Sequence, residues 1–147
     1  MGKSIEHMTT EEVEYTAHRL AQESLDWGEP IPDFSTRFPG VLEQCLAAPK
    51  YTFDKKQLYK GINLKASILF YVMIKNHPFQ NGNKRIAVIT LLYFLYKNDL
   101  WLTVDQNELY NFAKWIAESN PKLKDPTLAA IHEFLRQHIR DLDIRSL

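Results

Sequence analysis

The chain has 147 residues, which is the size of one ordinary domain and enough to bury a core without disulfides. Its 18 Lys and Arg residues balance its 18 Asp and Glu residues, so the net charge gives no sign of a nucleic-acid or acidic-membrane partner. The one cysteine, Cys45, excludes an intramolecular disulfide and favours a reducing, cytoplasmic setting. We expect a single domain over residues 1–147 that binds neither nucleic acid nor membrane.

The N-terminal part predicts a helix, a loop and a short second helix. Thr9 and Glu12 have the spacing of a capping box, and an apolar stripe follows them, so a helix is expected over residues 9–25. Three prolines and two glycines make residues 26–40 a loop. The next helix is short because it must end before Pro49.

The segment 50–59 is the main candidate for extended structure. Tyr51, Thr52 and Phe53 favour a strand, which we expect to form half of a small hairpin.

Two apolar segments predict the centre of the fold. Residues 63–76 and about 83–97 are apolar nearly all round, a pattern that is typical of helices buried on most sides. The stretch 98–105 is expected to be a turn or a short extended link. Asp105 then caps another helix, and a last helix is expected from about Thr127 to Asp141. These elements define a mainly α, compact helical domain with at most a small hairpin.

The loop between the two apolar helices reads "HPFQNGNKR" and carries the candidate chemistry. His77 lies where a buried helix ends, and a histidine there can act as a general base near neutral pH. It can equally cap the end of the preceding helix, because helix C-termini favour cations. Asn81 and Gly82 form a turn signal in which glycine can adopt positive φ. The other histidines lack the spacing of a zinc site.

Asn83, Lys84 and Arg85 open the second apolar helix. A helix N-terminus presents unpaired N–H groups and a partial positive charge, which bind anions and disfavour cations. Two cations at that position therefore indicate a phosphate site beside a proton acceptor. In the other interpretation the turn is solvated, and Lys84 and Arg85 pair with acids elsewhere in the chain.

The nine-residue loop resembles the signature of the Fic/Doc (Fido) family, roughly His-Pro-Phe-x-Asp/Glu-Gly-Asn-Gly/Lys-Arg, and departs from it only at Asn81. The segment "RFPGVLEQCLAAPKYTF" resembles the Gly-x-Leu-Glu region before the family's flap hairpin. The segment "LLYFLYKNDL" resembles the helix that follows the motif. The similarity covers most of residues 37–102 and implies a Fido-type helical domain with a small β-hairpin flap.

Members of this family transfer a nucleoside monophosphate, usually AMP from ATP, to a hydroxyl of a target protein. The Doc toxin branch instead transfers a phosphoryl group to a translation factor, elongation factor Tu. Lys84 stands where AMP-transferring members have glycine, and Val88 stands where they tend to have a second arginine. Both features resemble the Doc branch, so the resemblance implies a Doc-like toxin kinase that uses ATP or another nucleoside triphosphate with Mg²⁺.

The resemblance also implies roles for individual residues. His77 would be the general base, Gly82, Asn83 and Lys84 would cradle the phosphates, and Arg85 would hold phosphate and stabilise the transition state.

The flap at Tyr51, Thr52 and Phe53 would pair with an extended target segment. Asn81 replaces the acidic residue that binds Mg²⁺ in the family, so a neutral amide would be a weakened metal ligand.

Three functions remain open on the sequence. The first is a toxin-like transferase, phosphoryl or AMP, acting on a protein hydroxyl. The second is a nucleotide-binding Fido protein whose chemistry is weakened at Asn81, and the third is a helical interaction module without a nucleotide site. Because the first helix has Tyr15 where the family's self-inhibitory pattern needs Gly or Asn, inhibition is expected from a separate antitoxin-like partner.

Overall fold

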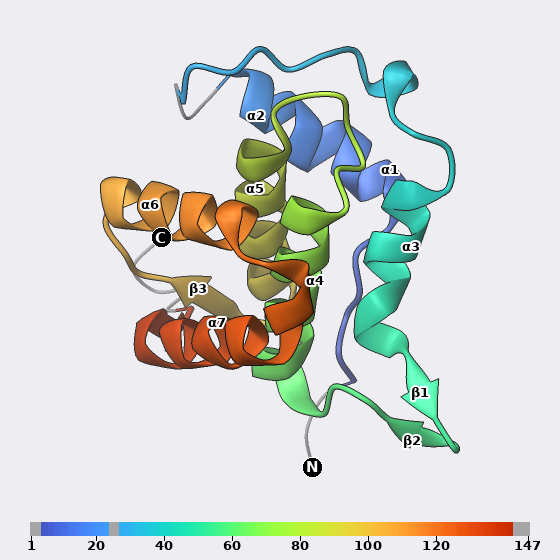
Figure 1. Ribbon diagram of the computed structural model, residues 1–147, viewed down its shortest axis with the longest axis vertical. Coiled ribbons are helices and arrows are strands. Elements are labelled where there is room, and N and C mark those ends of the chain that lie inside the picture. Colours follow the sequence, from blue (N-terminus) through green and yellow to red (C-terminus); the bar gives the residue numbers. More distant parts are fainter. Residues whose placement is uncertain (1–3, 24–26, 143–147) are drawn as a thin grey trace.

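The computed structural model describes residues 4–23 and 27–142. Two central helices, α4 (Gly61–Lys75) and α5 (Asn83–Lys97), run side by side in opposite directions, and the remaining helices surround them (Figure 1). The mainly α fold is therefore confirmed. None of the helices in the described ranges is long and apolar enough to cross a lipid bilayer.

The first helix is continuous from Thr10 to Glu23 but contains a π-helical turn, so it is assigned as α1 (Thr10–Glu12), η1 (Val13–His18) and α2 (Arg19–Glu23). The expected capping box is present: the Thr9 side chain accepts from the Glu12 N–H at 3.2 Å, and Glu12 Oε1 accepts from the Thr9 N–H at 3.0 Å. Residues 24 and 25 of the expected helix lie outside the described residues.

The following loop contains one 3₁₀ turn, η2 (Phe34–Thr36), and leads into α3 (Val41–Ala47). Helix α3 ends before Pro49, as predicted, and the chain continues through η3 (Ala48–Lys50).

The predicted hairpin is also present. Strand β1 (Thr52–Phe53) pairs antiparallel with β2 (Lys56–Gln57). The two linking residues, Asp54 and Lys55, have φ of 52° and 65°, which is the backbone that a tight two-residue hairpin turn requires.

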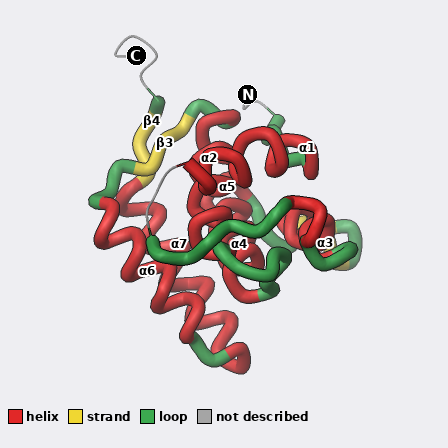
Figure 2. The backbone as a smooth tube through the Cα atoms, turned by 90° about the horizontal axis from the view of Figure 1, so that it is seen from above, coloured by secondary structure: helices red, strands yellow, loops and turns green. Residues whose placement is uncertain are grey.

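The C-terminal part departs from the sequence prediction. After β3 (Leu100–Leu102) come α6 (Gln106–Glu118), η4 (Pro121–Leu123), α7 (Lys124–His138) and β4 (Ile139–Asp141). The last helix was expected to reach Asp141, which is wrong. Residues 139–141 instead pair antiparallel with β3 and form a second small sheet at one edge of the molecule (Figure 2). The predicted cap at Asp105 is confirmed, since its side chain accepts from two N–H groups of α6.

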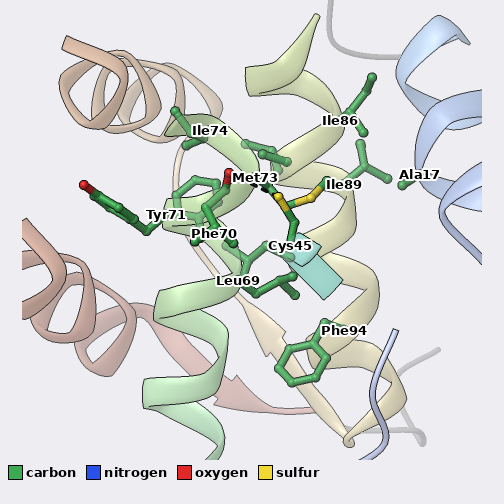
Figure 3. Packing of buried hydrophobic residues seen from close by; sticks show 14 of the residues in the cluster. Ala17, Cys45, Leu69, Phe70, Tyr71, Met73, Ile74, Ile86, Ile89 and Phe94 are labelled. Atoms are coloured by element: carbon green, nitrogen blue, oxygen red, sulfur yellow. Dashed lines mark hydrogen bonds between the residues drawn. The ribbon is translucent and has the colours of Figure 1, made fainter. Parts of the chain in front are cut away.

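The core lies on and between the two central helices (Figure 3). Every residue of α4 from Lys65 to Ile74 is buried, which agrees with the prediction of a helix covered on most sides. Phe70 and Met73 are fully buried, and the Cys45 thiol of α3 donates to the Val72 carbonyl at 3.4 Å. Burial raises the pKa of Cys45 to about 12, so this thiol is a packing group and not a nucleophile.

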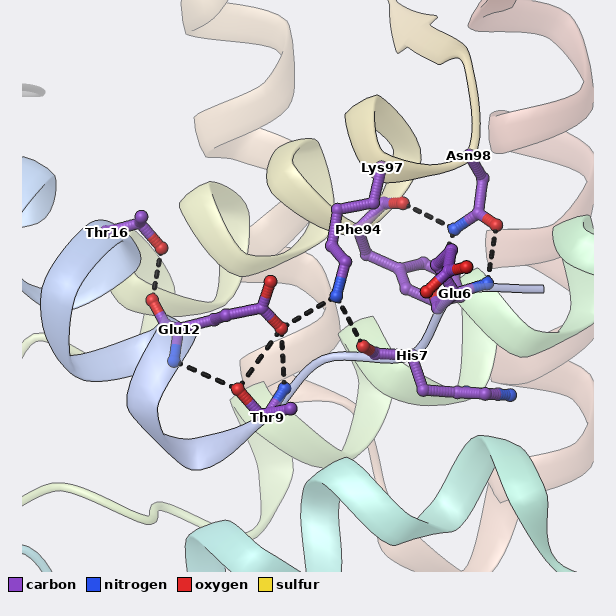
Figure 4. Close-up of polar contacts among 8 residues, drawn as sticks. All are labelled: Glu6, His7, Thr9, Glu12, Thr16, Phe94, Lys97 and Asn98. Carbon is purple, nitrogen blue, oxygen red and sulfur yellow. Dashed lines mark hydrogen bonds and ion pairs between the residues drawn. The ribbon is translucent and has the colours of Figure 1, made fainter.

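A polar network fixes the N-terminal segment to the far end of α5 (Figure 4). Lys97 Nζ donates to Glu12 Oε1 at 2.7 Å and to the His7 carbonyl at 2.6 Å. The Asn98 side chain bonds to both the N–H and the carbonyl of Glu6. The start of the first helix is therefore held against the end of α5 that is opposite the HPFQNGNKR loop.

Candidate active site

The loop Asn76–Gly82 joins the C-terminus of α4 to the N-terminus of α5, and its entry point is fixed by α6. Lys75, the last residue of α4, donates from Nζ to the carbonyls of Ser119 and Ala117, at 2.5 and 3.2 Å. These two bonds also satisfy carbonyls at the C-terminus of α6, where a cation is favourable.

His77 has φ of 50°, in the left-handed region that few residues other than glycine adopt. It also precedes Pro78, a position that normally favours extended backbone. Its side chain is exposed beside the cleft described below. A strained, exposed histidine next to the buried Pro78 and Phe79 is an arrangement found at many functional sites, because only surrounding contacts can hold it there.

Asn83 supplies those contacts. Its Oδ1 accepts from the Phe79 N–H at 3.0 Å and its Nδ2 donates to the Phe79 carbonyl at 2.8 Å. The same Nδ2 lies 3.4 Å from His77 Nδ1. The side chain assigned from the sequence to phosphate binding thus braces the loop and faces the histidine, which leaves its backbone N–H for a ligand.

The N-terminus of α5 has no side-chain cap. Gly82 is its N-cap with φ of 75°, and the first intrahelical bond runs from the Ile86 N–H to the Gly82 carbonyl. Asn81 Oδ1 accepts from the Gly82 N–H at 3.0 Å. The amides of residues 83–85 therefore begin the helix without a partner from a capping side chain, which is the arrangement that binds an anion.

These residues line a cleft of about 260 Å³, slightly below the usual range for small-molecule sites. A larger cleft of about 670 Å³ lies at the opposite end of α5, but no residue of the motif lines it. The motif cleft is lined by Glu29, Ile74, His77, Gln80, Asn81, Gly82, Asn83, Lys84 and Ala117.

Lys84 lies in this cleft but already has an acidic partner. Its Nζ donates to Glu29 Oε1 at 2.8 Å, and the two side chains are 21% and 32% exposed. One alternative from the sequence was that Lys84 pairs with an acidic residue elsewhere in the chain, and the structure shows such a pair. The pair leaves the lysine charge at the N-terminus of α5, where an anionic partner is favourable.

Arg85 is placed differently from the other motif residues. It is buried and does not line the cleft, and its Nη1 donates to the Ala21 carbonyl of α2 at 3.0 Å. Its buried Nε has no partner among the described residues. The guanidinium thus holds α2 against the start of α5 in this structure.

The hairpin at Tyr51, Thr52 and Phe53 is also distant from the cleft. It precedes the start of α4, whereas His77 follows its end, and α4 has 15 residues, or about 22 Å. Figure 1 shows the hairpin and the motif loop at opposite ends of that helix. The segment beside the motif loop is instead the one before α3, where the Phe38 N–H donates to the Pro78 carbonyl at 3.0 Å.

Three residues of this neighbourhood were not found from the sequence: Glu29, Ile31 and His18. Glu29 and Ile31 belong to a proline-rich loop that carries no recognised motif. Buried His18 contacts the carbonyl of Pro32 through Nε2 at 2.7 Å, and its ring packs against Phe34 and Phe79. His18 is the last residue of the π-helical turn, a rare structure that is frequent at functional sites. The helical pattern of the sequence does not predict this turn.

The donor set of the cleft fits a hard divalent cation that also binds phosphate. No group of three or more His, Cys, Asp or Glu side chains able to hold a metal occurs in residues 4–23 and 27–142. The cleft offers one carboxylate, Glu29, and the side-chain amide oxygens of Asn81 and Gln80. Mg²⁺ commonly binds one or two carboxylates and takes its other ligands from phosphates and water, so this set is adequate only together with a phosphorylated ligand.

The fold and the cleft define a helical domain with an uncapped helix N-terminus at the loop between its two central helices. A sequence model of the Fic/DOC family matches residues 7–95, more than half of the chain and inclusive of the whole motif loop. The chain belongs to the Fic/DOC family. No curated protein and no solved structure matched it.

Proposed function

We propose that the protein transfers a phosphoryl group from a nucleoside triphosphate to a hydroxyl of a target protein. The observation that carries this proposal is the position of His77 and Lys84 in one cleft at the uncapped N-terminus of α5. Fic/DOC membership supports a protein-modifying transferase in general. A proton acceptor beside a phosphate cradle is the minimum that hydroxyl phosphorylation requires.

In the proposed reaction His77 accepts the proton of the target hydroxyl as its oxygen attacks the γ-phosphorus. The bond from the γ-phosphorus to the β,γ-bridging oxygen breaks, and the nucleoside diphosphate leaves with that electron pair. Lys84 and the first N–H groups of α5 hold phosphate oxygens, where developing charge is stabilised. A bound Mg²⁺ would neutralise charge between adjacent phosphates.

The choice of phosphoryl over AMP transfer is supported by two positions. Lys84 supplies a cation where AMP-transferring relatives are expected to have glycine. Val88 is 1% exposed within the core, so this turn of α5 offers no second arginine. AMP transfer to a protein hydroxyl is the alternative, and the two are separated with ATP labelled at either the α- or the γ-phosphate. Transfer of only the γ-label is expected.

Arg85 is proposed to assist phosphate binding, for which its guanidinium must reach the cleft from its buried position beside the Ala21 carbonyl. Arg85→Lys separates this role from a structural one. If Arg85 contacts phosphate, the variant loses more free energy of nucleotide binding than free energy of unfolding. A structural role alone would lower the melting temperature and leave nucleotide affinity of the folded protein unchanged.

The target is proposed to be a cytoplasmic protein such as a translation factor, and an antitoxin-like partner is proposed to inhibit in trans. Strand addition at the β1–β2 hairpin would position the target from the far end of α4. Phe53 is 74% exposed there, so Phe53→Ala is expected to raise KM for the target without changing the melting temperature. If Phe53→Ala leaves KM for the target unchanged, the target binds at another surface, such as the segment Phe34–Phe38.

Two observations favour a nucleotide-binding protein with weak chemistry as the second candidate. Asn81 is neutral at the expected metal position, and Lys84 is engaged by Glu29. A thermal shift with ATP, with and without Mg²⁺, tests the site that both candidates share. ATP is expected to raise the melting temperature of the wild type, and less that of Lys84→Met. No shift under either condition would contradict a nucleotide site.

A further inference from the structure

Glu29 is the one carboxylate among the described residues that line the motif cleft. It contacts Lys84 across 55 positions of sequence, so the fold and not local chain geometry brings it there. Its charge has the wrong sign for a site that receives phosphates. A triphosphate entering this cleft meets Glu29 and must either displace it or share a cation with it.

The loop that carries Glu29 is anchored in a way that opposes displacement. Two residues further on, the side chain of Ile31 covers Gly82, and its Cδ1 lies 2.2 Å from where a Cβ on that glycine would be. The Pro32 carbonyl contacts His18, and Phe34 packs against Phe79 of the motif loop, with ring centroids 5.8 Å apart. The backbone on which Glu29 sits is therefore part of the same packed unit as the motif.

Asn81 leaves the cleft with a partial set of ligands. Its Oδ1 accepts from the Gly82 N–H, and a carbonyl oxygen has one further lone pair to offer. A neutral amide contributes no charge toward Mg²⁺, which binds proteins through carboxylates and phosphates. A negative charge is present in the lining of the same cleft, at Glu29.

We propose that Glu29 is the protein's carboxylate ligand for a divalent cation that bridges it to the phosphates of a bound nucleotide. On phosphate binding, Lys84 exchanges Glu29 for a phosphate oxygen, and the freed carboxylate binds the cation. Glu29 thus makes tight nucleotide binding depend on the metal. Without a cation the carboxylate repels the phosphates, and with a bound cation both the carboxylate and the phosphates are ligands of that cation. This assignment rests on the proposed function. It places the carboxylate ligand at Glu29, in the loop before α3, and not at position 81 of the motif.

The test uses the full chain and the non-hydrolysable β,γ-imido analogue of ATP, titrated calorimetrically in Mg²⁺ and in EDTA. Binding of Mn²⁺ in the presence of the analogue is followed by electron paramagnetic resonance. The variants are Glu29→Gln, Asn81→Asp and the double substitution. Glu43→Gln is the matched control, because Glu43 is also paired with a basic side chain, Arg37 at 3.4 Å, but lies outside the cleft.

Wild type and Glu43→Gln are expected to bind the analogue at least about tenfold more tightly with Mg²⁺ than without it, the low end of the change in metal affinity that follows when groups around a metal site are altered. In Glu29→Gln the metal-free affinity rises, the effect of Mg²⁺ nearly vanishes and Mn²⁺ binding weakens. Asn81→Asp in that background restores the effect of Mg²⁺, because it returns a carboxylate to the cleft. Freshly prepared protein is checked by peptide mapping, since Asn81-Gly82 deamidates readily.

Two results would overturn the assignment and are distinguishable. If Glu29→Gln raises affinity by the same factor with and without Mg²⁺, Glu29 is only the partner of Lys84 and the metal is held elsewhere. If neither the wild type nor any variant binds the analogue under either condition, the nucleotide site itself is wrong, and this assignment fails with it.

Discussion

At the scale of single residues, His77 and Asn83 have different roles in the candidate site. The histidine is exposed in a left-handed backbone conformation, and the asparagine holds that conformation through both atoms of its amide. A base needs freedom to exchange protons, whereas the loop that presents it must be rigid. Placing these properties on two side chains six positions apart satisfies both requirements.

His77→Ala is expected to abolish transfer and leave nucleotide binding nearly unchanged, because a general base acts only in the chemical step. The expected loss in kcat is about 10²- to 10⁴-fold, the usual contribution of a positioned base. Steady-state kinetics with the target and calorimetry with the ATP analogue measure the two effects separately. Transfer at the wild-type rate would remove His77 from the mechanism.

Gly82→Ala is expected to destabilise the protein for two separable reasons. The positive φ costs about 1–2 kcal/mol for a residue with a Cβ, and that Cβ would also displace the terminal methyl of Ile31, a smaller cost because the end of this side chain can rotate away. Gly40 is a matched control, since it too is a helix N-cap, with φ of 81°, and has no neighbour within 4 Å.

Denaturant unfolding of four variants separates the two costs. Gly40→Ala should show only the backbone term, and Gly82→Ala should lose more. Combining Gly82→Ala with Ile31→Ala should recover the excess relative to Ile31→Ala alone. Equal losses at both glycines in the wild-type background would mean that Ile31 yields freely and does not cover the phosphate cradle closely.

The motif residues could be recognised from the sequence because they are contiguous, and a loop between two helices brings contiguous residues together without further information. Glu29, Ile31 and His18 could not be recognised, since their meeting with the motif depends on how a proline-rich loop crosses the start of α5. The position of Arg85 was also not available from the sequence, because its contact with Ala21 depends on where α2 ends.

At the scale of elements, long uniform patterns were informative and short ones were not. Helices α4 and α5 have 15 residues each and are apolar nearly all round, so a buried central pair followed from the sequence. Strand β4 has three residues at the end of a helical pattern, and its partner β3 lies far back in the chain. The sequence pattern therefore predicts helix as far as residue 141, whereas residues 139–141 form backbone hydrogen bonds with β3.

The first helix depends on Glu12, which joins its N-terminus to the end of α5 through Lys97. Burial opposes ionisation of Glu12, but the hydrogen bonds from Lys97 and Thr9 outweigh burial and lower the pKa of this carboxyl below its ordinary value of 4.5. Because the folded-state pKa is depressed, this stabilisation is present above about pH 4.5 and is lost as the pH falls through the folded-state value.

Glu12→Gln is therefore expected to lower the free energy of unfolding by about 1 kcal/mol at neutral pH, the scale of a cap joined to a partly buried ion pair. The deficit should shrink as the solution is acidified below the pKa of the wild-type carboxyl. Glu14→Gln, on the same helix and without an ion pair among the described residues, is the control. A deficit that stays constant with pH would show that shape and not charge makes Glu12 stabilising.

At the scale of the whole molecule, the two ends of the central helix pair have different tasks. One end carries His77 in its strained backbone conformation, the uncapped helix N-terminus and the loop with Glu29. The other end is fixed by Lys97 and Asn98 to the N-terminal segment, with the exposed β1–β2 hairpin nearby at the start of α4 (Figures 1 and 4). The buried core of α4 and α5 connects the two ends and fixes the loop between these helices.

The most direct measurement is quantitative mass spectrometry of a cell lysate incubated with ATP, Mg²⁺ and either the wild type or His77→Ala. Phosphorylation of a serine, threonine or tyrosine hydroxyl on a small number of proteins is expected in the wild-type sample, at least about a hundredfold above the His77→Ala sample. The paired variant removes the contribution of kinases in the lysate. An AMP adduct in place of the phosphate would contradict phosphoryl transfer, and equal modification in both samples would contradict the assignment of this cleft as an active site.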